Sequence, residues 1–220
     1  MERIDIPARG ARLTLYRTVA PADTLLVALL PVEADLSRLP MYKRDRAALL
    51  AVTGMDWAAL PPWPAPALRE GDPPFPGSGA DFLRTLTDEL LPAACRAADC
   101  RPARYRLLGV SLSGLFALWA ACTTDRFDAC ASLSGSFWYD GFTDWLRTHP
   151  ARTPRVYLGL GRKEQDARHP RLAAIARATD ETAQFLRRAG VSVTAERFPG
   201  GHRQTPGRLA RAVRWLLDGQ

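Results

Sequence analysis

The sequence predicts an α/β fold, a mostly parallel central sheet with helices on both faces. Apolar segments of strand length alternate with segments of helical spacing along most of the 220 residues. An apolar strand, a tight turn and an apolar helix follow directly on one another over residues 105–122. No internal repeat or linker divides the chain, so we expect a single domain over residues 1–220.

The composition is that of an ordinary globular protein, with 47% hydrophobic and 24% charged residues. The formal net charge of +7 comes mostly from scattered arginines. Because no basic run with interleaved aromatics is present, we expect a solvated basic surface and no nucleic-acid partner. No apolar run reaches the roughly 18 residues of a membrane span, and the N-terminus lacks a signal-peptide core. We therefore expect no membrane partner and a cytoplasmic location.

The chain has four cysteines, Cys95, Cys100, Cys122 and Cys130. Their spacing matches neither a C-x-x-C motif nor a site with histidine ligands, so we expect no metal, and no motif indicates a cofactor. Cys122 and Cys130 lie in apolar segments and are predicted to be buried thiols. A Cys95–Cys100 disulfide would require an oxidising compartment.

In the first quarter of the chain, the pattern predicts three strands and one helix. Residues 12–18 alternate as an edge strand does, whereas residues 24–30 are continuously apolar and indicate a central strand. Residues 35–41 are expected to form a short helix. Residues 47–53 form a second continuous apolar strand, which ends at Gly54.

Residues 55–80 form a long irregular segment, with seven prolines between Pro61 and Pro76. Proline lacks the N–H group that regular elements need, so we expect a loop. A loop of this length in a compact domain is usually functional or disordered, and its aromatic residues argue against disorder. Two interpretations remain open, a wall of an active site or a polyproline-like strap packed on the surface.

The remaining elements alternate between helix and strand. Asp81 is expected to cap a helix whose apolar stripe includes Phe82 and Leu90. The later segments predict strands over 105–110, 127–133, 155–160 and 191–198, and helices over 112–122, 172–190 and 209–216. Since ligands bind beyond the carboxyl ends of such strands, Ser111, the loop after Gly161 and His202 should share one edge of the sheet.

Ser111 lies at the turn between the strand over 105–110 and the helix that follows. The turn, Gly109 to Gly114, is close to the G-x-S-x-G pattern, in which a strained strand-to-helix turn lifts a serine hydroxyl off the sheet. Ser113 replaces the second glycine but is still small. A capping serine in an ordinary turn would give the same local pattern. The buried strand and helix on either side favour the strained turn over that alternative, and over Ser78, Ser134 and Ser136 as the reactive serine.

A serine hydroxyl becomes a good nucleophile only when a base takes its proton, and the base is usually a histidine oriented by a carboxylate. The histidines are His149, His169 and His202. His202 follows the last predicted strand in a glycine-rich turn, and we select it as the base. In the loop after Gly161, Glu164 and Asp166 both qualify as the acid, although both also suit a solvated mixed-charge loop.

An ester carbonyl that is attacked by serine needs two N–H groups to hold its developing negative charge. The N–H of Leu112 is the expected first donor, because it directly follows the serine. The second should come from the loop after residues 24–30. Pro31 has no N–H, so Val32 is the candidate.

These segments together resemble the putative esterase family of α/β hydrolases, which includes enterochelin esterases and S-formylglutathione hydrolases, and most closely a small bacterial branch of it. The turn at residues 109–117 is similar to the family's G-x-S-L-A-G-L-F-A. Further similarity lies at the S-P/G-S-x-W segment (134–138), the S-L-G-D-K-E segment (158–164), the P-G-N/G-H turn (199–202), and the G-x-D-W and P-W-P segments (54–57 and 61–64).

The resemblance implies a single α/β-hydrolase domain with Ser111 as nucleophile, His202 as base and Glu164, ahead of Asp166, as acid. Two departures stand out, because Ser113 replaces a smaller residue and Arg162 replaces an aspartate. Trp57, Trp63 and Trp138 are expected to line the substrate pocket, although packing in the core would explain each of them equally well.

The function we expect is hydrolysis of a small-molecule carboxylic ester by a serine hydrolase, through a Ser-His-Glu triad and an acyl-enzyme. An acyltransferase or thioesterase with the same nucleophile is an alternative, and so is a catalytically silent binding protein of the same fold. The sequence defines neither the ester nor the oligomeric state.

Overall fold

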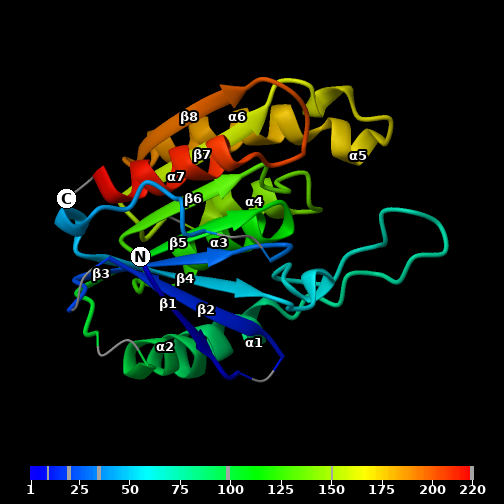
Figure 1. The fold of residues 1–220 in the computed structure, drawn as a ribbon. Helices are drawn as coiled ribbons and strands as arrows, with labels where there is room; N and C mark the ends of the chain where they lie inside the picture. Colours follow the sequence, from blue (N-terminus) through cyan, green and yellow to red (C-terminus); the bar gives the residue numbers. More distant parts are fainter. Residues whose placement is uncertain (9, 19–20, 34–35, 98–99, 150, 219–220) are drawn as a thin grey trace.

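One eight-stranded sheet organises the protein, in the order β1-β2-β4-β3-β5-β6-β7-β8 (Figure 1). The computed structural model describes residues 1–220 except 9, 19–20, 34–35, 98–99, 150 and 219–220. The strands are β1 (Glu2–Ile6), β2 (Arg12–Arg17), β3 (Thr24–Leu29), β4 (Ala47–Thr53), β5 (Arg104–Val110), β6 (Ala129–Leu133), β7 (Arg155–Gly161) and β8 (Ser192–Phe198). The predicted α/β fold with a mostly parallel sheet is confirmed.

The sheet is antiparallel only at its N-terminal edge. β1 pairs with β2 and β2 with β4 in antiparallel fashion, whereas every pairing from β4 to β8 is parallel. β3 and β4 are buried along their whole length, which agrees with their continuous apolar sequences and confirms the prediction of central strands. β2 was predicted at the edge, and this is wrong, because β1 pairs outside it, with Ile4 opposite Leu15.

Helices cover both faces of the sheet, as predicted. They are α1 (Gly79–Thr85), α2 (Leu91–Ala97), α3 (Leu112–Thr123), α4 (Phe142–Thr148), α5 (Pro170–Ala173), α6 (Ile175–Arg188) and α7 (Pro206–Asp218). A π-helical segment, η3 (Leu86–Leu90), joins α1 to α2, and short 3-10 turns form η1 (Lys43–Asp45), η2 (Trp57–Ala59) and η4 (Glu164–Asp166). In Figure 1, α7 crosses in front of β6 and β7, and α3 lies behind the sheet.

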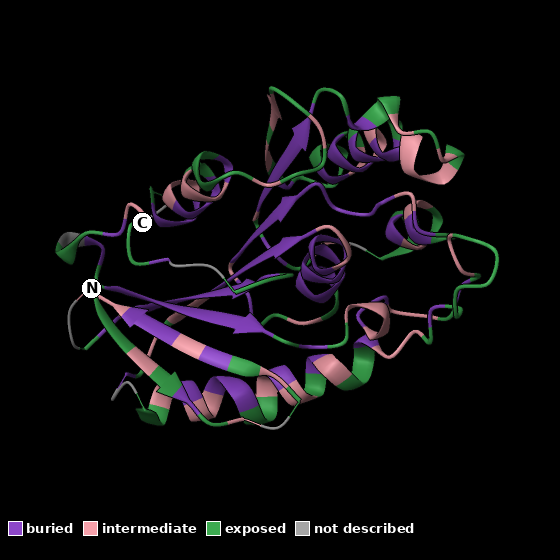
Figure 2. Cartoon of the chain, turned by 45° about the vertical axis from the view of Figure 1, so that its right-hand side comes forward, coloured by how far each residue is buried: buried purple, intermediate pink, exposed green. Residues whose placement is uncertain are grey.

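Each face of the sheet has its own apolar core. Neighbouring residues of β3 show the division. Leu25 belongs to the core that contains buried residues of α1, α2, α3, α4 and α6, whereas Leu26 belongs to the core that contains those of α7. α3 is apolar on all sides and accordingly buried from Ser113 to Cys122. Figure 2 shows the central strands and α3 almost wholly buried, whereas the outer sides of α6 and α7 reach solvent.

Two local predictions fail. The described part of the helix predicted at 35–41, residues 36–41, forms turns, because its buried residues Leu36 and Met41 pack on the α7 face and Pro40 offers no N–H; residue 35 lies outside the described residues. Asp81 does not cap its helix, since α1 begins two residues earlier, and it instead pairs with Arg84.

The cysteines are thiols in this structure. Burial raises the pKa of the Cys122 thiol to about 12 and raises that of the Cys130 thiol well above its ordinary value, as expected for buried cysteines. No disulfide joins Cys95 to Cys100, and a hydrogen bond from Cys100 lowers the pKa of the Cys95 thiol to about 6.

We predict that Gly109→Ala unfolds the protein or destabilises it by about 3 kcal/mol. A Cβ on Gly109 would lie 2.0 Å from the carbonyl oxygen of Ser113, so the backbones of β5 and α3 would have to separate. Gly207→Ala in α7 is the matched control, because its Cβ would meet nothing closer than 3.9 Å. Urea unfolding followed by circular dichroism measures both variants; equal stability of the two would contradict this close approach.

Candidate active site

Ser111 lies in a strained turn between β5 and α3. Its backbone angles are φ 59° and ψ −121°, a conformation that non-glycine residues rarely adopt. The turn is tight because Gly109 lets the backbone of β5 approach that of α3 directly. Local sequence therefore produces the strained strand-to-helix turn expected of a nucleophile elbow.

Ser113 fits the turn despite being larger than the alanine or glycine of the pattern. Its side chain is fully buried, and its Oγ lies 2.8 Å from the carbonyl oxygen of Leu29 and 2.9 Å from that of Val110. The same oxygen accepts a hydrogen bond from the Val110 N–H at 2.8 Å. Ser113 thus ties the elbow to the neighbouring strand β3 instead of crowding it.

Three side chains from different loops form one hydrogen-bonded chain at the carboxyl edge of the sheet. His202 Nε2 lies 3.1 Å from Ser111 Oγ, and His202 Nδ1 lies 2.7 Å from Glu164 Oε2. Ser111 follows β5, Glu164 follows β7 and His202 follows β8. These strands are parallel members of one sheet, so their carboxyl ends meet at the same edge. The structure therefore brings together the three residues that the sequence singled out.

Glu164 is buried and richly hydrogen-bonded. Its side chain is 2% exposed, and Oε1 accepts bonds from the Ser134 hydroxyl at 2.7 Å and the Gly161 N–H at 2.6 Å. Burial alone would raise the pKa of Glu164, but the hydrogen bonds from His202, Ser134 and Gly161 outweigh it, and the pKa lies below the ordinary 4.5. The alternative acid, Asp166, is exposed to solvent, whereas Glu164 contacts the imidazole.

The cavity in front of Ser111 is small and mostly apolar. It has a volume of about 250 Å³ and is lined by Leu68, Ser111, Leu112, Ser136, Trp138, Glu164, Ala167, Leu172, Ile175 and His202. Ser136 is buried, and its Oγ lies 3.5 Å from Ser111 Oγ. Trp138 is among the lining residues, as the sequence analysis expected. Sequence reasoning did not find Leu68, Leu172 and Ile175, since their spacing resembles that of ordinary packing residues.

The structure does not bring Trp57 and Trp63 to the cavity lining. Trp63 instead fixes the proline-rich segment to the loop after β6. Its Nε1 donates to the Asp140 carbonyl at 2.8 Å, and the Tyr139 hydroxyl donates to the Trp63 carbonyl at 2.6 Å. Its ring also packs against Trp145. The strap at 55–80 is thus packed in part, with residues 69–74 exposed, and it reaches the cavity through Leu68.

The two expected N–H donors differ in their surroundings. Leu112 is the first residue of α3 and lines the cavity, and the first N–H groups of a helix have no partner within the helix. Val32 follows β3, the strand beside β5, but its side chain is 68% exposed and lines a separate apolar hollow of about 440 Å³ next to α7.

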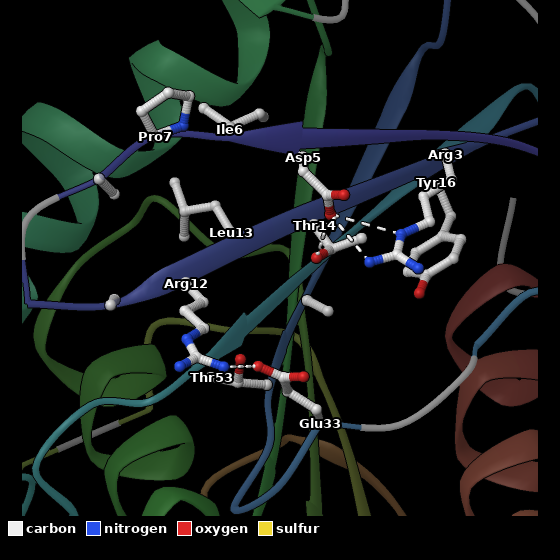
Figure 3. Close-up of a pocket in the computed structure, with 13 residues that line it drawn as sticks. Arg3, Asp5, Ile6, Pro7, Arg12, Leu13, Thr14, Tyr16, Glu33 and Thr53 are labelled. Atoms are coloured by element: carbon white, nitrogen blue, oxygen red, sulfur yellow. Dashed lines mark hydrogen bonds and ion pairs between the residues drawn. The ribbon is translucent and has the colours of Figure 1, made fainter.

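A larger hollow of about 620 Å³ lies over β1, β2 and β4, away from Ser111 (Figure 3). Its charged side chains pair with one another, Arg3 with Asp5 and Arg12 with Glu33. None of the candidate site residues from the sequence lines this hollow.

The other two histidines make structural contacts. His149 stacks on the ring of Trp145, and His169 caps the N-terminus of α5, where its Nδ1 accepts a hydrogen bond from the Arg171 N–H at 3.2 Å. Within the described residues, no group of three or more histidine, cysteine, aspartate or glutamate side chains is placed to hold a metal ion. None of the described helices is long and apolar enough to cross a membrane.

Comparison with known proteins agrees with this architecture. The family described as "Putative esterase" matches residues 55–210, which is most of the chain. The chain belongs to this family. It is also similar to the uncharacterized protein YbbA of Bacillus subtilis (strain 168), with 25% identity over 134 residues, 59% of this chain and 54% of YbbA. The match thus spans about half the length of that relative.

Solved structures share the fold at low sequence identity. The siderophore hydrolase EstA of Aspergillus nidulans superposes with a TM-score of 0.74 at 17% identity, covering 99% of this chain and 94% of EstA. An IroE-like serine hydrolase of Shewanella oneidensis gives 0.75 at 14%, covering 99% and 80%. The enterobactin esterase FES of Shigella flexneri gives 0.69 at 22%, covering 99% and 58%. At these identities the likeness concerns the fold.

We predict that Glu164→Gln lowers stability by about 2 kcal/mol near neutral pH, and that the difference disappears in acid. The lowered pKa of Glu164 means that the native state binds this proton less readily than the unfolded chain does. Its stabilising contribution is therefore complete above the ordinary pKa and is lost as the pH falls through the lowered one. Urea unfolding of both proteins between about pH 7 and pH 3 measures the difference.

The exposed Asp166→Asn is the matched control and should unfold like the parent at every pH. A Glu164→Gln protein whose stability deficit stays constant down to about pH 3 would contradict a native carboxylate at this position.

Proposed function

We propose that the protein hydrolyses a small-molecule carboxylic ester with Ser111 as nucleophile, His202 as general base and acid, and Glu164 as the residue that orients His202. The observation that carries the proposal is the continuous contact from Ser111 Oγ through His202 to Glu164, with distances of 3.1 Å and 2.7 Å. Contacts of this length allow proton transfer from the serine and alignment of the imidazole.

In the first half of the reaction, Ser111 Oγ attacks the ester carbonyl carbon while His202 Nε2 takes the serine proton. The carbonyl π electrons move to oxygen, and the N–H groups of Leu112 and Val32 hold the resulting oxyanion. When the tetrahedral intermediate collapses, the bond to the alcohol oxygen breaks and His202 gives its proton to the departing alcohol. The acyl group remains bound to Ser111.

In the second half, a water molecule attacks the acyl carbonyl while His202 takes a proton from it. Collapse releases the carboxylic acid, and the proton returns from His202 to Ser111 Oγ. Glu164 stays ionised throughout and stabilises the imidazolium, in line with its lowered pKa and its buried position. In this role the carboxylate holds Nδ1 protonated so that Nε2 faces the serine.

Two features of the site support hydrolysis over transfer to a bound acceptor. The His202 side chain is 54% exposed, so bulk water reaches the base directly. The cavity of about 250 Å³ has little room for a second organic molecule beside an acyl group, because pockets that bind one small molecule usually measure about 300 Å³ or more. The strap at 55–80 borders this cavity through Leu68.

We predict that a fluorophosphonate probe labels the parent once and does not label Ser111→Ala. The reagent reacts with an activated serine, so His202→Ala should be labelled roughly 10³-fold more slowly because no base takes the proton. Intact-mass spectrometry over a time course measures both effects. Ser136→Ala is the matched control and should be labelled like the parent, since that hydroxyl lies only 3.5 Å from Ser111 Oγ yet has no role in the proposed proton transfer.

Labelling of Ser111→Ala at the parent rate would contradict the assignment of the nucleophile. A folded parent that accepts no label would favour the catalytically silent binding protein.

We also predict that free carboxylic acid is the main product when a p-nitrophenyl ester is supplied together with competing alcohols, amines or thiols. Water reaches the exposed His202, whereas the small cavity disfavours a second organic acceptor. Product analysis by liquid chromatography and mass spectrometry distinguishes the outcomes. A dominant acyl-acceptor product would identify a transferase.

A further inference from the structure

The turn that presents His202 has little structure of its own. It is formed by residues 199–202, Pro-Gly-Gly-His, between β8 and the segment that leads to α7. Gly200 has φ +87°, a conformation that glycine adopts readily, and two adjacent glycines favour many alternative conformations in the absence of outside contacts. The position of the imidazole therefore depends on groups that bind this turn from outside.

Every backbone carbonyl from Phe198 to His202 accepts a hydrogen bond. The donors are the Arg162 N–H to Phe198, Arg208 Nη2 to Pro199, the Lys163 N–H to Gly200, Arg208 Nη1 to Gly201, and Gln204 Nε2 to His202. The loop after β7, which carries Glu164, thus binds one side of the turn. One arginine side chain supplies two of the remaining contacts, at 2.6 Å and 2.8 Å.

Arg208 lies in the first turn of α7, yet its side chain is only 4% exposed. A buried guanidinium is costly unless its charge and its donors are matched. Here the carbonyls of Pro199 and Gly201 accept from its two terminal nitrogens, and Nη1 lies 4.0 Å from Glu164 Oε1. The guanidinium also lies over the ring of Phe198, 5.4 Å from its centre. It is therefore enclosed by the two loops that carry the base and the acid.

We propose that Arg208 is a positioning residue for ester hydrolysis. It holds the His202 turn and the Glu164 loop in the relative positions that the reaction requires. This inference rests on the proposed function. Arg208 is not itself a lining residue of the cavity, and its contacts are with the His202 turn and Glu164, so it acts through these residues and not on the substrate. Its two donors replace the strand or helix hydrogen bonds that a glycine-rich turn lacks.

The geometry favours arginine over lysine at this position. The planar guanidinium presents several N–H donors in a fixed arrangement and can bind two carbonyl oxygens at once, whereas an ammonium group is a compact point charge on a flexible chain. Arg208→Lys should therefore keep the charge near Glu164 but lose the simultaneous hydrogen bonds to the carbonyls of Pro199 and Gly201.

The test compares Arg208→Ala, Arg208→Lys and the parent in steady-state hydrolysis of p-nitrophenyl acetate. We expect kcat to fall roughly 10²-fold in Arg208→Ala with little change in KM, because a misplaced base slows the chemistry more than it weakens binding. Arg208→Lys should retain an intermediate kcat. Added guanidinium ion, well below denaturing concentrations, should restore part of the activity of Arg208→Ala, and neutral urea at the same concentration should not.

Arg106→Ala is the matched control. Arg106 is also a buried arginine that donates to a carbonyl of α7, that of Leu216, but at the far end of the helix from the active site. Its loss should lower stability while the folded fraction keeps the parent kcat. Circular dichroism and urea unfolding determine the folded fraction of each variant, and Arg208→Lys serves in its place if Arg208→Ala does not fold.

A parent-like kcat in folded Arg208→Ala or Arg208→Lys would overturn the proposal, and so would an Arg208→Ala activity that follows the folded fraction alone and does not respond to guanidinium. Failure of the proposed function is distinguishable, because in that case the parent itself would not hydrolyse the ester and would take no fluorophosphonate label.

Discussion

The close approach of β5 to α3 at Gly109 is the constraint on which the site depends. With no side chain at Gly109, the strand can turn directly into the helix, and a Cβ there would lie 2.0 Å from the Ser113 carbonyl oxygen. Ser111 must then adopt a positive φ of 59°. The surrounding structure sustains this strain, because α3 is buried on all sides and Ser113 hydrogen-bonds to β3. The turn projects the hydroxyl beyond the sheet edge as a consequence of packing.

The parallel sheet then brings His202 and Glu164, the proposed base and acid, to that hydroxyl from distant parts of the chain. The acid and the base have opposite environments. Glu164 is buried and hydrogen-bonded by fixed donors that lower its pKa, whereas the His202 side chain is half exposed to solvent. We infer that Arg208 preserves this difference, because it binds the turn of His202 and lies beside the carboxylate of Glu164.

Much of this arrangement could be predicted from the sequence, and the exceptions share a physical cause. Continuous apolar runs identified β3 and β4, because this signal is local. Turn residues after three strands likewise indicated Ser111, His202 and the loop that contains Glu164 and Asp166, and the family resemblance placed Glu164 ahead of Asp166. The contacts of Arg208, Leu68 and Trp63 could not be predicted, since an arginine in an amphipathic helix or a tryptophan in a proline-rich loop is equally compatible with several environments. β1 was missed and residues 36–41 were assigned wrongly for the same reason, because pairing and packing with distant segments decide short, weakly patterned stretches.

The measurement that tests the central claim most directly is detection of the acyl-enzyme. The parent would be mixed rapidly with a p-nitrophenyl ester, quenched in acid, and examined by intact and peptide mass spectrometry while the release of nitrophenol is followed. The account predicts a burst of nitrophenol of about one equivalent and the acyl mass on the peptide that contains Ser111. Linear release without any acylated peptide, or an acyl group on a different residue of the folded protein, would contradict it.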